Sequence, residues 1–249
     1  MTTELTARQT QILKVLIDEY IETAEPVGSL ALERKYNLGI SPATIRNEMA
    51  ALIAKGYLRQ PHTSAGRVPS PQAMKFYINQ LMDEKQVSVM DEVQAKEKVW
   101  DVRNDPEELM REATEALAIK TGSLAVGTIE DEGVWCYGHS FLFRYPNMFN
   151  EEMFYDLFAT LEESKRLQEL FFHRLTGINP IEVLFGEELE WGHMAPLGIV
   201  ATRFTIGDKS GAIGIVGPYG LNYPSIIPTV RYFGSLIRQM TNEQETSQG

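Results

Sequence analysis

The sequence predicts an α+β protein of two domains, and three observations support this prediction. A helical pattern before residue 56 is followed by a short polar hairpin. After residue 105, helical and strand-like runs alternate, which is typical of an antiparallel sheet with flanking helices. The length of 249 residues also exceeds that of an average single domain.

The first part of the chain is expected to contain two helices before the hairpin region. Thr6 is a good N-cap residue for a first helix that runs to about Glu22. After a turn at residues 24–28, a second helix is expected from Ser29 to about Tyr36. The next turn contains glycine and leads directly into a third helix, which gives a helix-turn-helix arrangement.

The third helix begins at Ser41 and has two different faces. Ser41 can cap its first turn, and Pro42 suits its first position. The helical spacing of Ile45, Met49 and Leu52 predicts a core-facing stripe. The opposite face holds small or hydrogen-bonding side chains, namely Ala43, Thr44, Arg46, Asn47 and Ala50. Such a face can enter a DNA groove, where Asn pairs with adenine and Arg with guanine or phosphate.

A small β-ribbon is expected after Gly56, which ends the third helix. Residues 57–60 form an extended run, residues 61–66 a polar turn, and Arg67 begins the return strand. This order predicts a winged helix-turn-helix. We expect His62, Ser64 and Arg67 of the wing to contact phosphates or the minor groove, against the alternative of a solvated turn.

Charge favours a nucleic-acid partner for this part of the chain. Residues 28–82 include seven basic and two acidic residues, a balance of 7 − 2 = +5, whereas the whole chain has a net charge of −11. A basic island in an acidic protein is typical of a partner with a phosphate backbone. The acidic total argues against indiscriminate binding to nucleic acid or to anionic membranes.

The remaining chain is expected to form a linker and a second domain. A helix at residues 71–84 closes a DNA-binding domain at residues 1–84, and the polar residues 85–105 are interpreted as a linker. The alternative for that segment is a coiled helix that joins two copies. In the second domain, residues 106–249, we expect one helix at 106–120, two between 150 and 175 and one at 223–240. Strands are expected at 124–129, 134–143, 182–185, 197–206 and 211–216.

Reactive side chains form no catalytic or metal-binding pattern. Cys136 and His139 are three residues apart on an expected strand, so they point to opposite faces. His173 and His193 lack the spacing of metal ligands. The glycine-rich run at Gly214 lacks the Lys and the Ser/Thr of a phosphate-binding loop. We therefore predict a protein that is not an enzyme and that needs no metal or cofactor.

Cysteine use and hydropathy indicate a cytoplasmic protein. The single cysteine allows no internal disulfide, and no signal peptide is evident. No apolar run reaches the roughly 18 residues that a membrane-spanning helix needs.

Residues 5–82 contain three distinctive and almost continuous runs, LTARQTQILKVLIDEYIETAEPVGSLAL, LGISPATIRNEMAALIAKGYLRQPHTSAGRVPS and KFYINQLM. These runs resemble the N-terminal domain of the family of the heat-inducible transcription repressor HrcA. Near the other end, GIVGPYGLNYPSIIPTVRY is similar to the closing motif of that family.

The resemblance implies a repressor of chaperone operons that binds an inverted-repeat operator in double-stranded DNA as a homodimer. It also implies a GAF-like fold for the second domain and dependence on the GroEL chaperonin. By position, it assigns DNA contacts to Ser41, Thr44, Arg46, Asn47, His62, Ser64 and Arg67. The chain is shorter than typical members, and we expect the missing part between Gly122 and Phe149.

A second class of function remains open from the residues. The chain could be a ligand-sensing or protein-interaction module that keeps a winged helix and regulates other genes. A basic stripe on the third helix would favour the repressor, and a pocket with convergent polar groups in the second domain would favour the sensor. For the homodimer, we expect the Phe-rich helices between Asn150 and Leu175 to form the contact.

Overall fold

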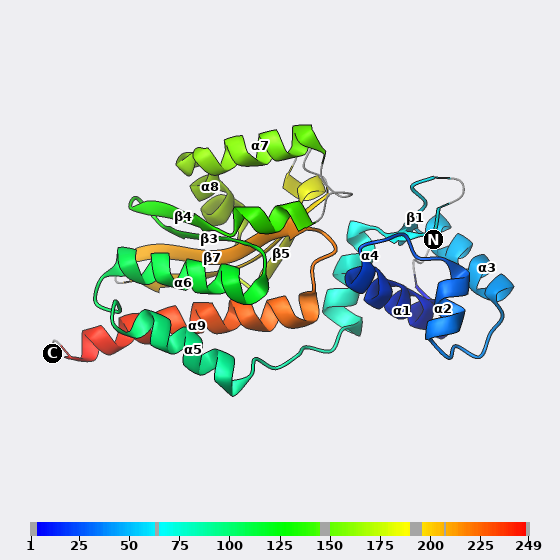
Figure 1. Cartoon of the computed structure of the whole chain (residues 1–249), viewed down its shortest axis with the longest axis horizontal. Helices are drawn as coiled ribbons and strands as arrows, with labels where there is room; N and C mark the ends of the chain where they lie inside the picture. The colour runs from blue at the N-terminus through cyan, green and yellow to red at the C-terminus, as the bar shows by residue number, and fades with distance from the viewer. Residues whose placement is uncertain (1–3, 63–64, 145–149, 190–195, 207, 248–249) are drawn as a thin grey trace. The chain divides into compact units, whose positions relative to one another are not determined.

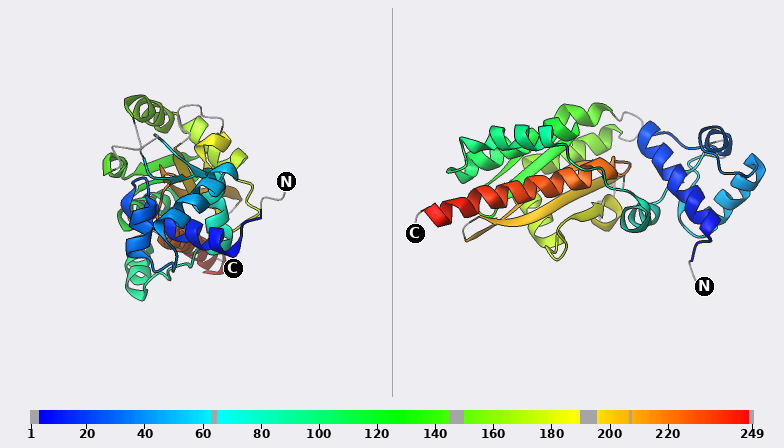
Figure 2. Two further views of the ribbon diagram at one scale, coloured as in Figure 1. Left: turned by 90° about the vertical axis from the view of Figure 1, so that its right-hand side faces the viewer. Right: turned by 90° about the horizontal axis from the view of Figure 1, so that it is seen from below.

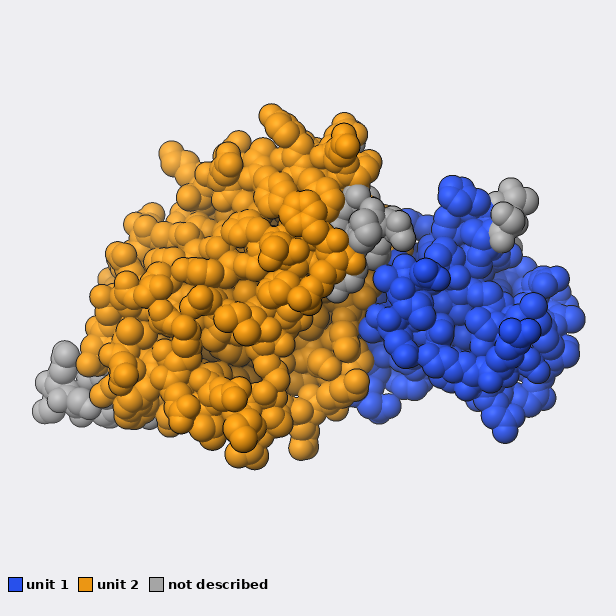
Figure 3. Space-filling model, in the orientation of Figure 1, with its two compact units in different colours: residues 1–83 blue, residues 84–249 orange. Residues whose placement is uncertain are grey.

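The computed structural model describes residues 4–62, 65–144, 150–189, 196–206 and 208–247. The chain divides into two compact units, Met1–Asp83 (unit 1) and Glu84–Gly249 (unit 2), which are coloured separately in Figure 3. Helices combine with an antiparallel sheet, so the expected α+β class is confirmed.

Unit 1 is a group of short helices with one β-hairpin (Figure 1). In chain order its elements are α1 (Ala7–Thr23), α2 (Ser29–Lys35), α3 (Pro42–Ala54), β1 (Leu58–Arg59), β2 (Val68–Pro69), α4 (Pro71–Phe76) and a π-helical turn, η1 (Tyr77–Leu81). Thr6, Ser41 and Ser70 each accept a hydrogen bond from a backbone N–H of the following first turn. These caps satisfy donors that a helix start leaves free, so the chain begins each of these helices where the sequence predicts.

The core of unit 1 is built from one face of each helix. The buried side chains include Ile12, Leu13, Leu16 and Ile17 of α1, Leu32 of α2, Ile45, Met49 and Leu52 of α3, and Met74 and Tyr77. The Tyr77 hydroxyl donates to Asp18 Oδ1 of α1 at 2.6 Å. This hydrogen bond gives the buried phenol a partner and raises its pKa together with burial.

Unit 2 contains one five-stranded antiparallel sheet with the strand order β4-β3-β7-β6-β5. Its helices and turns are α5 (Val89–Trp100), α6 (Pro106–Thr121), η2 (His139–Arg144), α7 (Glu151–Glu162), α8 (Ser164–Glu169), η3 (Leu170–Arg174), η4 (Gly186–Leu189) and α9 (Tyr223–Ser247). The strands are β3 (Leu124–Ile129), β4 (Gly133–Tyr137), β5 (Glu182–Phe185), β6 (Leu197–Ile206) and β7 (Lys209–Pro218).

Helices cover both faces of this sheet (Figures 1 and 2). Gly127, Ile213 and Thr202 lie in register across β3, β7 and β6, and they face α6 and α9. The neighbouring row faces α7 and η3, where Leu157 of α7 and Phe171 of η3 pack into the core. Because both faces are covered, every residue of β3 is buried.

The segment 85–105 is not the separate linker that its polar composition suggested. Its helix α5 buries Ala95 and Val99 and packs on α6 and α9. The Tyr232 hydroxyl donates to the Glu92 carbonyl at 2.8 Å, and Lys98 pairs with Glu112 at 2.8 Å. The apolar stripe of Ala95 and Val99 is narrow and lies among many charged residues, so the composition did not predict that α5 would pack on unit 2.

The second expected strand, residues 134–143, ends earlier than predicted. Pairing with β3 stops at Tyr137. Gly138 then adopts a left-handed backbone with φ of 89°, and a Cβ atom there would lie 2.5 Å from the Ser123 carbonyl oxygen. The chain turns at this glycine and continues as η2, so His139 lies outside the sheet.

Close approach of α6 to β3 gives a test of the packing of unit 2. A Cβ atom at Gly127 would lie 2.2 Å from Thr114 Oγ1 and 2.9 Å from Met110 Cε. We expect Gly127→Ala to lower the free energy of unfolding of unit 2 by about 1–3 kcal/mol, as overpacking does in a filled core. Denaturant titration measures this change.

The double variant Gly127→Ala/Thr114→Ala is the matched control, because it removes the nearest obstacle. It should recover part of the lost stability. Equal stability of Gly127→Ala and the parent chain would show that α6 does not sit this close to β3.

Candidate nucleic-acid interface

Helix α3 presents one face to solvent and the other to the core of unit 1. Ile45, Met49 and Leu52 are buried, while Arg46 and Asn47 are exposed. Ala43 and Ala50 are also exposed and stand one turn to either side of Asn47. The small side chains leave room for another molecule to approach the Asn47 amide.

Ser41 and Thr44 organise the start of α3. The Ser41 hydroxyl accepts from the Thr44 N–H at 3.2 Å, and the two hydroxyl oxygens are 3.0 Å apart. Ser41 is exposed and Thr44 is half-buried. Their first task is therefore to cap the helix, and they hold its first turn at the solvent surface.

Glu48, the one acidic residue of α3, is turned away from the exposed face. Its carboxylate accepts from Gln9 Nε2 at 3.1 Å and lies 3.6 Å from the Arg8 guanidinium. Both partners belong to α1. The pairing holds this carboxylate toward α1 and away from Arg46 and Asn47, a consequence that the sequence pattern did not reveal.

The β-hairpin is tied back to the turn before α2. Val27 and Arg67 exchange two backbone hydrogen bonds of 2.9 and 2.8 Å. Neither residue stood out for this in the sequence, because the bridge joins positions far apart in the chain. It fixes the base of the hairpin relative to α2 and α3.

Arg67 does not project outward as the wing position suggested. Its side chain is half-buried, and Nη1 donates to the carbonyls of Ala65 at 3.0 Å and Gly66 at 3.4 Å. Its Nε is buried and has no hydrogen-bond partner within the described residues. The guanidinium therefore holds its own turn together. His62 is exposed, and Ser64 lies outside the described residues.

A groove of about 400 Å³ separates the hairpin from α2 and α3 within unit 1. Arg46 and Arg67 both line it, together with Met49, Leu30 and Gln60. Two guanidinium groups thus border one concave surface beside the exposed face of α3, which is a favourable place for an anionic partner.

Some basic residues of the island at residues 28–82 make contacts within unit 1 in place of facing a partner. Lys35 is held by Glu19 at 2.6 Å and Glu22 at 2.5 Å, and these hydrogen bonds raise its pKa. Lys55 donates to the Glu4 carbonyl at 2.7 Å and to Gln9. The charge of Lys35 is thus compensated by two carboxylates, whereas Lys55 bonds neutral oxygens and keeps its positive charge at the end of α3.

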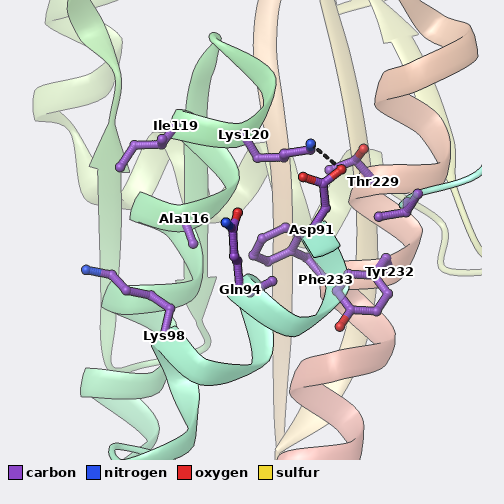
Figure 4. A pocket seen from close by; sticks show the side chains of 11 residues that line it. Asp91, Gln94, Lys98, Ala116, Ile119, Lys120, Thr229, Tyr232 and Phe233 are labelled. Carbon is purple, nitrogen blue, oxygen red and sulfur yellow. Dashed lines mark ion pairs between the residues drawn. The ribbon is translucent and has the colours of Figure 1, made fainter. Parts of the chain in front are cut away.

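Unit 2 contains a pocket of about 260 Å³ between α5, α6 and α9 (Figure 4). Asp91 and Lys120 form an ion pair of 2.5 Å across it, and Lys120 lowers the pKa of Asp91. Lys98 pairs instead with Glu112 and Glu115. The charged groups neutralise one another and do not converge on the empty space.

Of the two residues considered for catalysis, Cys136 is half-buried at the edge of the core and His139 is exposed. Cys136 packs against the apolar cluster under α7 and α8, and burial raises the pKa of its thiol to about 11. His139 stacks on Phe158 with ring centroids 6.2 Å apart. Within the described ranges, no group of three metal-ligating side chains occurs, and no helix is long and apolar enough to span a membrane.

Comparison with known proteins gives a consistent family match. Residues 67–227 match the family model of the HrcA protein C terminal domain. The heat-inducible transcription repressor HrcA of Acetivibrio thermocellus is 46% identical over 115 residues, which is 46% of this chain and 32% of that protein. That of Roseiflexus castenholzii is 24% identical over 345 residues, covering 98% of this chain and 96% of that protein.

The relatives contain sequence that this chain lacks. The matched segment spans about a third of the Acetivibrio protein. At least 96 positions of the longer alignment, the difference between 345 and 249, lie opposite gaps in this chain. A crystal structure described only as a hypothetical protein shares the fold, with a TM-score of 0.75 and 18% identity over 98% of this chain and all of that one.

The half-buried Cys136 thiol gives a pH-dependent prediction. We expect Cys136 of the folded protein to resist alkylation by iodoacetamide at pH 8, because its pKa of about 11 leaves almost no thiolate. The unfolded thiol ionises near pH 8.5. Stability from this group is therefore complete below that pH and is lost as the pH rises toward 11. Mass spectrometry of native and urea-unfolded protein measures the labelling, and equal rates would contradict the burial.

Proposed function

Because the chain belongs to the HrcA family of heat-inducible transcription repressors, we propose that it represses chaperone operons by binding an inverted-repeat operator as a homodimer. The observation that supports DNA binding best is the exposed face of α3, with Asn47 between two alanines and with Glu48 turned inward. No catalytic step is part of this proposal.

Unit 1 is proposed to be a winged helix-turn-helix domain, with boundaries close to residues 1–84. In this reading α2 and α3 form the helix-turn-helix, α3 enters the major groove, and the β1–β2 hairpin is the wing. Ser41 and Thr44 would place the start of α3 near a phosphate. The exposed His62 and, by position, Ser64 would lie along the neighbouring groove.

Asn47 and Arg46 are proposed to do different work on DNA. The Asn47 amide can donate and accept at once, which suits the N6 and N7 atoms of adenine. Arg46 borders the groove beside the hairpin and is better suited to a backbone phosphate. Base contacts distinguish sequences, whereas phosphate contacts hold any DNA.

Unit 2 is proposed to be a GAF-like regulatory and dimerisation domain. Its antiparallel sheet with helices on both faces supports this reading. By analogy with the family, the GroEL chaperonin would keep the repressor active in the cytoplasm. Operator binding measured with and without GroEL tests that part, and identical affinities would refute it.

A ligand sensor remains the second candidate, and the pocket under α5 is the observation that bears on it. Its charged side chains are paired, Asp91 with Lys120 and Lys98 with Glu112. They leave no convergent set for a polar ligand, so we favour a repressor without a small-molecule inducer at this pocket.

The role of Asn47 can be tested by a single substitution. We expect Asn47→Ala to weaken binding to the operator by about 1–3 kcal/mol while binding to scrambled DNA stays the same, because one base contact is lost. Binding isotherms with both DNAs measure the ratio. Asn79→Ala, an exposed asparagine elsewhere in unit 1, is the control. An unchanged ratio for Asn47→Ala would place the recognition face elsewhere.

Arg46 and Arg67 can be distinguished by salt dependence. Arg46→Ala should weaken binding to all DNA and reduce the salt slope by about one unit, since one phosphate contact disappears. Arg67→Ala should also weaken both DNAs, because the hairpin loses the bonds to Ala65 and Gly66, but its salt slope should stay near that of the parent. Salt-titrated isotherms decide, and a lower slope for Arg67→Ala would show direct phosphate contact.

A further inference from the structure

Helix α5 has an apolar face on each side. Its inner face holds the buried Ala95 and Val99 and packs against α6 and α9. Its outer face carries Val89, Met90 and Trp100, which are 76%, 66% and 39% exposed, and Val93, which is 47% exposed. The inner face is sufficient to fix the helix on unit 2, so the outer apolar side chains need another explanation.

The outer side chains are concentrated on one short helix. Of the nine large hydrophobic residues exposed in the described parts of the chain, four belong to α5. Single exposed apolar residues are ordinary, whereas a contiguous group usually marks a surface that contacts another molecule.

The spacing on the outer face is that of a helix–helix seam. Val89, Val93, Lys96 and Trp100 follow one another at intervals of four, three and four residues. This is the repeat that places side chains along the contact line of two paired helices. A flat ligand or a loop would not require this period over the whole helix.

We propose that α5 pairs with α5 of a second copy of this chain, antiparallel around a two-fold axis between Gln94 and Ala95. The proposal rests on the homodimer of the proposed function and gives its contact surface. Such an axis makes the interface isologous, so every contact occurs twice.

Charge complementarity supports the antiparallel arrangement. In this register Val89 stands opposite the partner's Trp100, and Lys96 stands opposite the partner's Val93, one residue from the partner's Glu92. Glu92 and Lys96 lie on the same edge of the outer face, four residues apart. The two-fold axis therefore produces two ion pairs between the copies, each joining Lys96 of one chain to Glu92 of the other. A parallel pairing would instead bring Lys96 level with the partner's Lys96, which is repulsive.

Two cationic side chains, Lys96 and Arg103, lie over the ring of the exposed Trp100. Lys96 Nζ lies 5.3 Å and the Arg103 guanidinium carbon 4.3 Å from its ring centroid. Attraction between a cation and an aromatic ring strengthens as water is removed. A partner that covers Trp100 therefore keeps these contacts and strengthens them.

The Phe-rich helices, which the sequence suggested as the dimer surface, are mostly used within unit 2. Met153, Leu157 and Phe171 are buried against the sheet, and Phe154 and Phe158 pack on the same cluster. Tyr155 is the large side chain left exposed on α7, at 75%. It offers a matched site for comparison with α5.

The first experiment measures the mass of the full chain by light scattering at micromolar protein. We expect the parent chain and Tyr155→Lys to be dimers and Val93→Lys to be a monomer with unchanged circular dichroism, because the new lysine would face the partner's Lys96. A dimeric Val93→Lys would overturn the α5 pairing while the homodimer stood. A monomeric parent, with and without operator DNA, would overturn both.

The second experiment exchanges the proposed ion pair. Lys96→Glu alone and Glu92→Lys alone should each weaken dimerisation about threefold to tenfold, since two symmetric pairs are lost. The double variant Lys96→Glu/Glu92→Lys should return to within about threefold of the parent, because the charges are complementary again. Sedimentation equilibrium measures these constants. A double variant weaker than both single variants would overturn the antiparallel register.

Discussion

Burial of one side of α3 is the constraint on which the proposed DNA interface depends. Ile45, Met49 and Leu52 are fully or almost fully buried, so the helix cannot rotate without exposing them. This fixes Asn47 on the solvent side. The backbone bridge between Val27 and Arg67 then sets the hairpin beside the same face. Recognition chemistry and hydrophobic packing are therefore two consequences of one helix orientation.

Pairing of charges within unit 1 shapes what a partner would meet. Glu48 is held by α1, and Glu19 and Glu22 are held by Lys35. These pairs compensate three carboxylates and one lysine within unit 1. The remaining positive groups beside the groove are guanidinium groups, which bind phosphate through a planar fork and stay charged at every relevant pH. Where an arginine is placed beside α3 thus matters more than the total count of basic residues.

In unit 2, helix α5 forms an additional layer outside the helices α6 and α9 that cover the sheet. Helices α6 and α9 already cover one face, and α5 packs on them through only a few apolar residues. Because α5 lies in this outer layer, its other side remains accessible. The same helix therefore links the fold of unit 2 to the proposed contact between copies, without using the pocket between α5, α6 and α9.

The sequence by itself determined the α+β class, the helix starts at Thr6, Ser41 and Ser70, and the exposed face of α3, because caps and helical spacing act over a few residues. Tertiary structure decided what depends on distant partners. It placed α5 in unit 2, ended β4 before His139, and turned Arg67 inward onto its own turn. Local patterns predict which face of an element a side chain lies on. Its contacts depend on residues distant in the sequence, so only the tertiary structure determines them.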